Sequence, residues 1–182
     1  MTVTESASAR PLSPRDPRLA PWRAFLTAHA RIARKLDEEL RSEHDLSLAE
    51  YDALLTIADT PDRRIRMRQL ADRVLLSKSG VTRLIDRLVS DGLVTRCASI
   101  DDARGAEAVL TEAGLDRLRG ASRTHLRGVA DHFLAVVDDD DMPTIERSML
   151  AMADRIGPGG ESDRCQSMAA AMELTGADTS AD

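Results

Sequence analysis

The stretch "LLSKSGVTRLIDRLVSDGLVTR", residues 75–96, has the pattern of a short amphipathic helix followed by a strand. Its apolar positions have the i, i+3, i+4, i+7 spacing of one helix face: Val81, Leu84, Ile85 and Leu88. Ser77 and Ser79 are both suited to cap the helix start, and Gly92 follows the last apolar turn, where a left-handed residue commonly ends a helix. The opposite face combines short hydroxyl groups with arginines. Such a face suits contact with a phosphate backbone and base edges, and it equally suits an ordinary solvated surface.

The composition favours a helical protein with one sizeable core. Of 182 residues, 42% are hydrophobic and 31% charged, whereas only 2% are aromatic. The chain has no apolar run long enough to cross a membrane and no apolar secretory leader, so we expect a cytoplasmic protein. Its two cysteines, Cys97 and Cys165, are far apart and form no CxxC motif. We therefore expect no structural disulfide, and neither cysteine is assigned a redox role.

The overall net charge of −6 hides a basic region. Residues 61–105 contain ten basic and six acidic residues, a net charge of +4, whereas the rest of the chain carries −10. Nearly all the basic residues are arginine, which contacts phosphate and guanine in a bidentate manner. A basic island in an acidic chain is typical of a nucleic-acid-binding surface.

The segments around residues 75–96 predict a winged helix-turn-helix. "MRQLADRVL", residues 67–75, predicts a shorter helix, and a tight turn separates it from the basic helix. After Gly92, "LVTRCAS" and "AEAVLT" are β-prone runs on either side of "IDDARG", which indicates a β-hairpin wing. The expected fold class is mainly α with this small hairpin: a winged helix-turn-helix plus a helical dimerisation region.

The first helix and the last two are longer than a compact winged domain needs, and their apolar stripes indicate burial against a second copy. A two-fold dimer would present two recognition helices about 34 Å apart, which suits a pseudo-palindromic DNA site.

Ser47-x-x-Glu50 forms a capping box at the start of the lobe that follows the first helix. We predict five regions: a disordered arm (1–17), an N-terminal dimerisation helix (18–46), a DNA-binding lobe (47–110), C-terminal dimerisation helices (111–156) and a mostly flexible tail (157–182).

The sequence resembles the MarR family of bacterial winged helix-turn-helix regulators. The resemblance rests on three segments in the family's order and spacing: "LSLAEYDALLTI", "RMRQLADRVLLSKSGVTRLIDRLVSDGLVTR" and "DDARGAEAVLTEAG". It covers residues 22–156. The resemblance implies a homodimer on a pseudo-palindromic operator, and a small-molecule pocket between the dimer helices and the DNA-binding lobe.

The candidate DNA-binding residues lie on the basic helix and the wing. They are Ser77, Lys78, Ser79, Thr82, Arg83, Arg87, Asp102 and Arg104. The resemblance implies that the helix reads bases and that Arg104 enters the minor groove, where negative potential attracts arginine. Asp102 is placed to orient Arg104. For Arg87, pairing with Asp86 or Asp91 and simple solvation remain alternatives to DNA contact.

The candidate ligand pocket contains aromatic and polar residues of the first two helices: Trp22, Phe25, His29, Tyr51 and Asp52. Such residues suit an aromatic or phenolic acid as effector. The alternative for His29 is a histidine satisfied in the core or in the dimer interface.

The sequence contains no catalytic motif such as GxSxG, a P-loop, GxGxxG or HExxH, so we expect no enzyme activity and no cofactor. No His, Cys and carboxylate spacing predicts a metal site. Two functions then compete. One is a ligand-responsive transcriptional repressor acting as a homodimer on double-stranded DNA, and the other is a winged-helix protein–protein adaptor without specific DNA binding.

Overall fold

The computed structural model describes residues 12–74, 78–98 and 106–156. Six α-helices, three strands and three short helical turns follow one another in this part of the chain. The helices are α1 (Ala20–His44), α2 (Leu48–Ala58), α3 (Met67–Arg73), α4 (Lys78–Ser90), α5 (Glu112–Val129) and α6 (Met142–Ile156). The strands are β1 (Arg64–Arg66), β2 (Val94–Ala98) and β3 (Ala106–Leu110). The turns are η1 (Pro17–Leu19), η2 (Pro61–Arg63) and the π-helical η3 (Ala130–Leu134).

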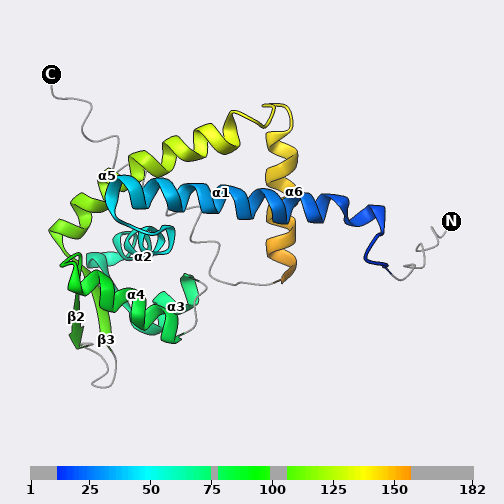
Figure 1. Ribbon diagram of the computed structural model, residues 1–182. Coiled ribbons are helices and arrows are strands. Elements are labelled where there is room, and N and C mark those ends of the chain that lie inside the picture. The colour runs from blue at the N-terminus through cyan, green and yellow to red at the C-terminus, as the bar shows by residue number, and fades with distance from the viewer. Residues whose placement is uncertain (1–11, 75–77, 99–105, 157–182) are drawn as a thin grey trace.

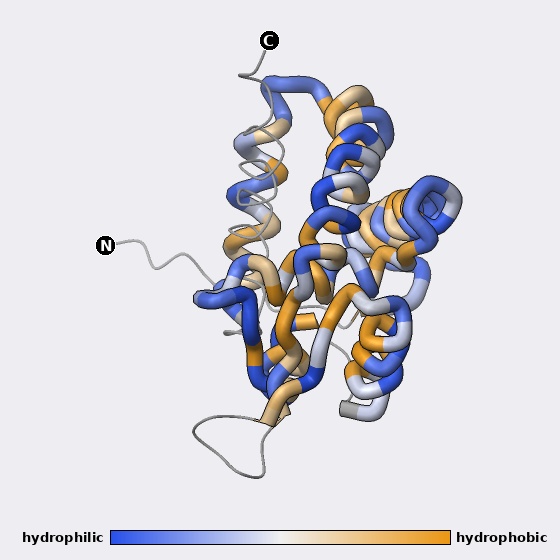
Figure 2. The backbone as a smooth tube through the Cα atoms, turned by 90° about the vertical axis from the view of Figure 1, so that its left-hand side faces the viewer, coloured by the Kyte–Doolittle hydropathy of each residue, from blue (hydrophilic) through white to orange (hydrophobic). Residues whose placement is uncertain are grey.

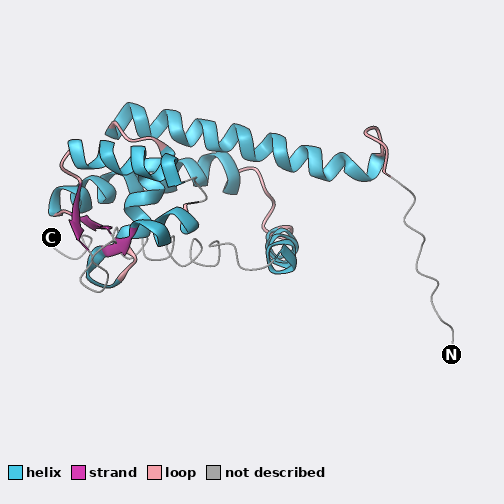
Figure 3. Ribbon diagram, turned by 90° about the horizontal axis from the view of Figure 1, so that it is seen from below, coloured by secondary structure: helices cyan, strands magenta, loops and turns pink. Residues whose placement is uncertain are grey.

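The helices are stacked on either side of α2. Figure 1 shows α1 and α5 side by side above α2, with α3, α4 and the strands below α2. α6 stands apart from α1, as the view from below in Figure 3 shows. Along the helices in Figure 2 hydrophobic and hydrophilic segments alternate, as the amphipathic sequence pattern predicts. α2 therefore lies between the long helices and the basic helix α4.

The sheet has three antiparallel strands in the order β1-β3-β2. Strands β2 and β3 form the predicted hairpin, in which Val94 pairs with Leu110 and Ala98 with Ala106. The prediction omitted β1, whose Ile65 pairs with Ala108. Three residues of sequence RIR are too short to show the alternation that reveals a strand. β1 therefore depends on pairing with β3 rather than on its own pattern.

One apolar core joins the second half of α1 with α2, α3, α4, the sheet and α5. Its largest fully buried side chains include Leu40, Leu46, Tyr51, Leu54, Ile57, Leu70, Ile85, Leu88, Leu115 and Leu118. The predicted inward stripe of α4 is confirmed, because Val81, Ile85 and Leu88 are buried and Leu84 packs against the core. α4 is thus held by one face and presents the other to solvent.

The capping box predicted for residues 47–50 is confirmed. Ser47 and Glu50 form the complete capping box of α2, and the Thr111 hydroxyl accepts a hydrogen bond from the Gly114 backbone N–H at 2.9 Å. α1 ends at Asp45, a non-glycine residue in the left-handed region with φ 51°. Regular α-helix in α5 stops at Val129, and a π-helical turn follows.

A close contact between α5 and the hairpin explains why the last residue of the "LTEAG" segment, Gly114, is a glycine. A Cβ atom at this position would lie 2.1 Å from the carbonyl oxygen of Leu93 and 2.8 Å from Cδ1 of Leu110. The Thr111 backbone N–H also donates to the Leu93 carbonyl, at 3.1 Å. α5 therefore begins in direct contact with the base of the hairpin, and only glycine permits that approach.

No helix among the described residues is long and apolar enough to cross a membrane.

Candidate nucleic-acid interface

The candidate interface is centred on the solvent-facing side of α4. Ser79, Thr82, Arg83 and Arg87 are all exposed, whereas the opposite face is buried. α4 begins at Lys78. Ser77 and the wing residues Asp102 and Arg104 lie outside the described residues. The helix thus presents hydroxyl groups and guanidinium groups on one surface, an arrangement that suits phosphate and base-edge contacts.

Arg96 of β2 fixes the hairpin to α4. Its guanidinium forms an ion pair with Asp86 at 2.6 Å and donates a hydrogen bond to the backbone carbonyl of Thr82 at 3.1 Å. No local pattern in the sequence indicates this role of Arg96. The wing strand and the candidate recognition helix are therefore joined by a charge-assisted contact as well as by the core.

Arg87 pairs with a residue that the sequence analysis did not consider. Its Nε lies 3.1 Å from Oε1 of Glu50 in the α2 capping box, instead of pairing with Asp86 or Asp91. The two residues are 37 positions apart, so no helical spacing could reveal the pair. The only hint of this pair in the sequence is the capping box, which places the Glu50 carboxylate at the start of α2.

The outer surface of the lobe carries further arginines. Arg66 at the end of β1 and Arg68 at the start of α3 are both exposed. Arg64 of β1 lies 3.8 Å from Oε2 of Glu107 on β3. These residues belong to the predicted basic region, so part of that region lies on the sheet and α3 as well as on α4.

The five candidate pocket residues fall into two groups within one chain. Trp22, Phe25 and His29 form a stacked row along the first half of α1, with ring centroids 5.9 Å and 6.2 Å apart. Trp22 is 53% exposed and Phe25 41%. Tyr51 is instead buried in the core, where its ring stacks on that of His125 at 4.6 Å. Asp52 follows Tyr51 on α2 and is half-buried.

Histidines gather where α1 and α2 meet α5. His44 lies 2.8 Å from the Thr124 hydroxyl, and His132 lies 2.9 Å from a Glu39 carboxylate oxygen. Burial lowers the pKa of His125 and that of His44, so both favour the neutral form. The described part of the chain contains no group of three potential metal ligands. These histidines support the packing of the helices, because each is matched to a neighbouring side chain or ring.

Cys97 is an exposed free thiol on β2. Cys165 lies outside the described ranges.

Comparison with known proteins places this architecture in a family. A model of the MarR family matches residues 44–105, the segment from the end of α1 through the wing. A MarR family transcriptional regulator from Silicibacter pomeroyi is 30% identical, with 76% of this chain and 94% of that chain covered at a TM-score of 0.63. The chain belongs to the MarR family.

Two further relatives extend the match. A MarR family transcriptional regulator from Streptomyces coelicolor, crystallised in complex with DNA, is 25% identical at a TM-score of 0.74. That match covers 84% of this chain and 94% of the regulator. The regulator SarZ of Staphylococcus saprophyticus is 33% identical over 92 residues, half of this chain. The match covers 61% of SarZ, less than two thirds of that relative. The winged helix-turn-helix fold predicted from the sequence is thereby confirmed.

Proposed function

We propose that this MarR family member is a sequence-specific DNA-binding transcriptional repressor that acts as a homodimer in the cytoplasm. The observation that carries the proposal is the exposed hydroxyl and arginine face of α4, held by a buried apolar face. In this proposal Ser79, Thr82 and Arg83 reach base edges or phosphates in the major groove. Ser77 and Lys78 contact phosphate at the helix start, and Arg104, oriented by Asp102, enters the minor groove.

The homodimer is supported by apolar side chains that one chain leaves exposed. Trp22, Phe25 and Leu26 are exposed on α1, and Met149, Leu150 and Met152 on α6. Side chains of this size favour burial against another surface. A second copy would cover both helices and place two α4 helices on one face of the duplex, which suits a pseudo-palindromic operator.

The repressor would release DNA when a small molecule binds beside the long helices. The stacked row of Trp22, Phe25 and His29 supports an aromatic or phenolic acid as that ligand, because flat rings and a polar imidazole match its chemistry. Release requires the ligand to bind the dimer geometry that fits DNA poorly more tightly than the geometry that fits it well.

The test is fluorescence anisotropy of the protein on DNA from upstream of its own gene, beside a scrambled duplex of the same composition. We expect tight binding to the upstream DNA only, weakening steeply with salt because each phosphate contact contributes about −0.9 to the log–log slope. Arg83→Ala should lower the affinity for the upstream DNA and reduce the discrimination by about 1–3 kcal/mol. Arg63→Ala, which removes a charge on η2 rather than on α4, is the matched control.

Weak, salt-insensitive binding that does not distinguish the two duplexes would contradict the proposal. The protein–protein adaptor would then be the better description of the winged lobe.

A further inference from the structure

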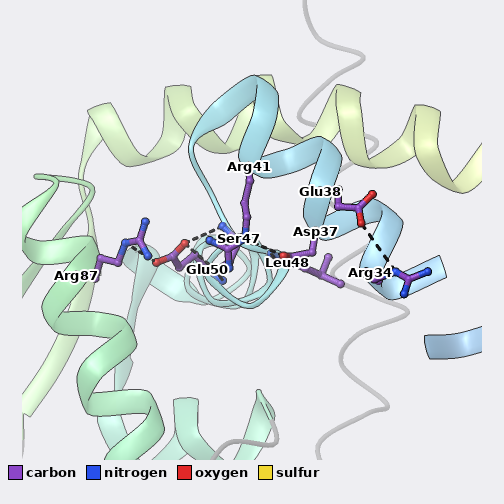
Figure 4. A network of polar contacts seen from close by, with 8 residues as sticks. All are labelled: Arg34, Asp37, Glu38, Arg41, Ser47, Leu48, Glu50 and Arg87. Atoms are coloured by element: carbon purple, nitrogen blue, oxygen red, sulfur yellow. Dashed lines mark hydrogen bonds and ion pairs between the residues drawn. The ribbon is translucent and has the colours of Figure 1, made fainter. Parts of the chain in front are cut away.

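A polar network with Glu50 buried at its centre connects the long helix α1, through the start of α2, to the candidate recognition helix α4. Figure 4 shows this network, which runs from Asp37 of α1 past Leu48 and Glu50 to Arg87. α2 is positioned for this role because it lies between α1 and α4 (Figure 1). The question is what the α4 end of the network contributes to DNA recognition.

Glu50 is a carboxylate in the protein interior. Its side chain is only 5% exposed, and Oε2 accepts hydrogen bonds from the backbone N–H and the hydroxyl of Ser47, each at 2.7 Å. Oε1 faces Nε of Arg87 at 3.1 Å. A buried carboxylate is costly unless its oxygens are matched by donors, and here both oxygens have donors. The Glu50 side chain is therefore held in one orientation.

The network continues to α1. Oδ1 of Asp37 accepts a hydrogen bond from the Leu48 backbone N–H at 2.8 Å, and Oδ2 pairs with Nε of Arg41 at 2.7 Å. Burial would raise the pKa of Asp37, but the hydrogen bonds from Arg41 and Leu48 outweigh it and lower that pKa. The start of α2 is thus fixed on α1 by one carboxylate and on α4 by another.

α4 has two kinds of attachment to the rest of the lobe. Val81, Ile85 and Leu88 are buried, and this apolar stripe sets which face of α4 turns toward the core. Directional contacts come from Arg96 to Asp86 and from Glu50 to Arg87. These two ion pairs join α4 to different neighbours, β2 and α2. Both ion pairs oppose a rotation of α4 about its axis, which would also change where Thr82 and Arg83 point.

We propose that Glu50 is a positioning residue for DNA recognition. It holds Arg87, and through Arg87 the rotation of α4, so that the exposed hydroxyl and arginine face meets the base edges correctly. Arg87 then acts mainly in this pair rather than as a phosphate contact. The inference rests on the proposed DNA-binding function and adds a residue that does not touch DNA.

The test uses Glu50→Gln, Arg87→Ala and the double variant on the upstream and scrambled duplexes. Gln retains the capping box through its amide oxygen but removes the negative charge that faces Arg87. We expect each single variant to lower the affinity for the upstream duplex about tenfold, and the double variant to lose no more than either single variant. Binding to the scrambled duplex and the slope with salt should stay unchanged. Arg63→Ala with Glu112→Gln removes an exposed ion pair away from α4 and is the matched control.

Three results of the DNA-binding experiment would overturn the proposal. One is a fall of about 0.9 in the salt slope of Arg87→Ala, which would show a phosphate contact. The others are additive losses in the double variant and unchanged affinity for Glu50→Gln.

Amide hydrogen exchange without DNA separates this proposal from the proposed function. We expect Glu50→Gln and Arg87→Ala to accelerate exchange in α4 while α5 is unchanged. If the wild-type protein fails to prefer the upstream duplex, the proposed function fails. Unchanged exchange in α4 would overturn the positioning role whatever the DNA result.

Discussion

Apolar side chains are buried in the lobe around α2 and α4 but exposed on the outer parts of α1 and α6. In the lobe, helices and strands bury their apolar faces against each other, so that Leu54, Ile85 and Leu88 have no exposed surface. On the first half of α1 and on α6, Trp22 and Met152 remain about half exposed. The lobe is complete within one chain, whereas the outer helices have apolar faces that another surface would cover.

α1 shows the difference within a single helix. Its second half buries Leu36 and Leu40 against the rest of the chain, while its first half exposes Trp22, Phe25 and Leu26. The amphipathic pattern continues through both halves, so the pattern alone does not say which neighbour covers each half. In the proposed homodimer the first half of α1 would be covered by the second copy, whereas the second half is already buried within one chain.

Gly114→Ala should destabilise the lobe more than any of the other substitutions. We expect it to lower the free energy of unfolding by about 3 kcal/mol, because the new Cβ would overlap the Leu93 carbonyl oxygen, a backbone atom that cannot move aside. Chemical denaturation monitored by circular dichroism measures this. Gly120→Ala is the control, since its nearest neighbours are atoms of the His44 ring at 3.3 and 3.4 Å. A loss in Gly120→Ala equal to that in Gly114→Ala would contradict the explanation.

Replacing Trp22 and Phe25 together by Glu tests the outer region. We expect the dimer to dissociate about a hundredfold more readily, because the change places charges on a surface that the account buries between two chains. Sedimentation velocity across a concentration series measures the change. Val89→Glu, at an exposed apolar position on α4, should leave the oligomeric state unchanged. Identical sedimentation of the double variant and the wild type would show that the α1 surface is not the interface.

The stability of the buried region should depend on pH through His125. Burial lowers the pKa of His125 in the folded state from its ordinary value of 6.5. Below that value the unfolded chain binds a proton that the folded chain does not, so the free energy of unfolding falls as pH drops. One such proton contributes at most about 1.4 kcal/mol per pH unit.

Denaturation between pH 5 and 7, a range that spans about the ordinary histidine pKa, measures this dependence. His125→Phe should flatten it, leaving the contribution expected from His44, whose pKa burial also lowers. Val89→Ala, at an exposed apolar position on α4, removes no titratable group and should retain the wild-type dependence. An equal flattening in both variants would contradict the assignment to His125.

Asp45→Gly tests the residue that connects α1 to the lobe. We expect it to raise the free energy of unfolding by about 0.5 kcal/mol, because glycine adopts the left-handed conformation of this residue without strain. Thermal unfolding provides the measurement. Asp59→Gly is the control, since Asp59 ends α2 with φ −80° and should only lose stability. A gain in Asp59→Gly would show that conformation is not the cause.

Local patterns predicted much of the fold. The capping box at Ser47 and Glu50, the stripe of α4 and the hairpin after Gly92 each depend on residues close together in sequence. Helix caps, periodicity and turn residues are local signals, and the structure confirms them. The exposed face of α4 followed from the same stripe.

Contacts between distant segments were not predictable in the same way. Glu50 with Arg87, and Arg96 with Asp86, depend on how whole elements pack. Gly128 also reflects packing between distant segments, since α1 approaches α5 so closely there that a Cβ would lie 2.5 Å from Cδ2 of Leu36. Similarly, the five pocket residues share aromatic and polar chemistry, but the fold separates Tyr51 from the α1 row.

The most direct test of the central claim is methylation protection of guanine N7 on the upstream DNA, which reports contacts in the major groove. We expect two patches of protected guanines about 34 Å apart, which is one helical turn of DNA, and we expect both to be lost in Arg83→Ala. Protection that is absent, limited to one patch or unchanged in Arg83→Ala would contradict DNA reading by two copies of α4.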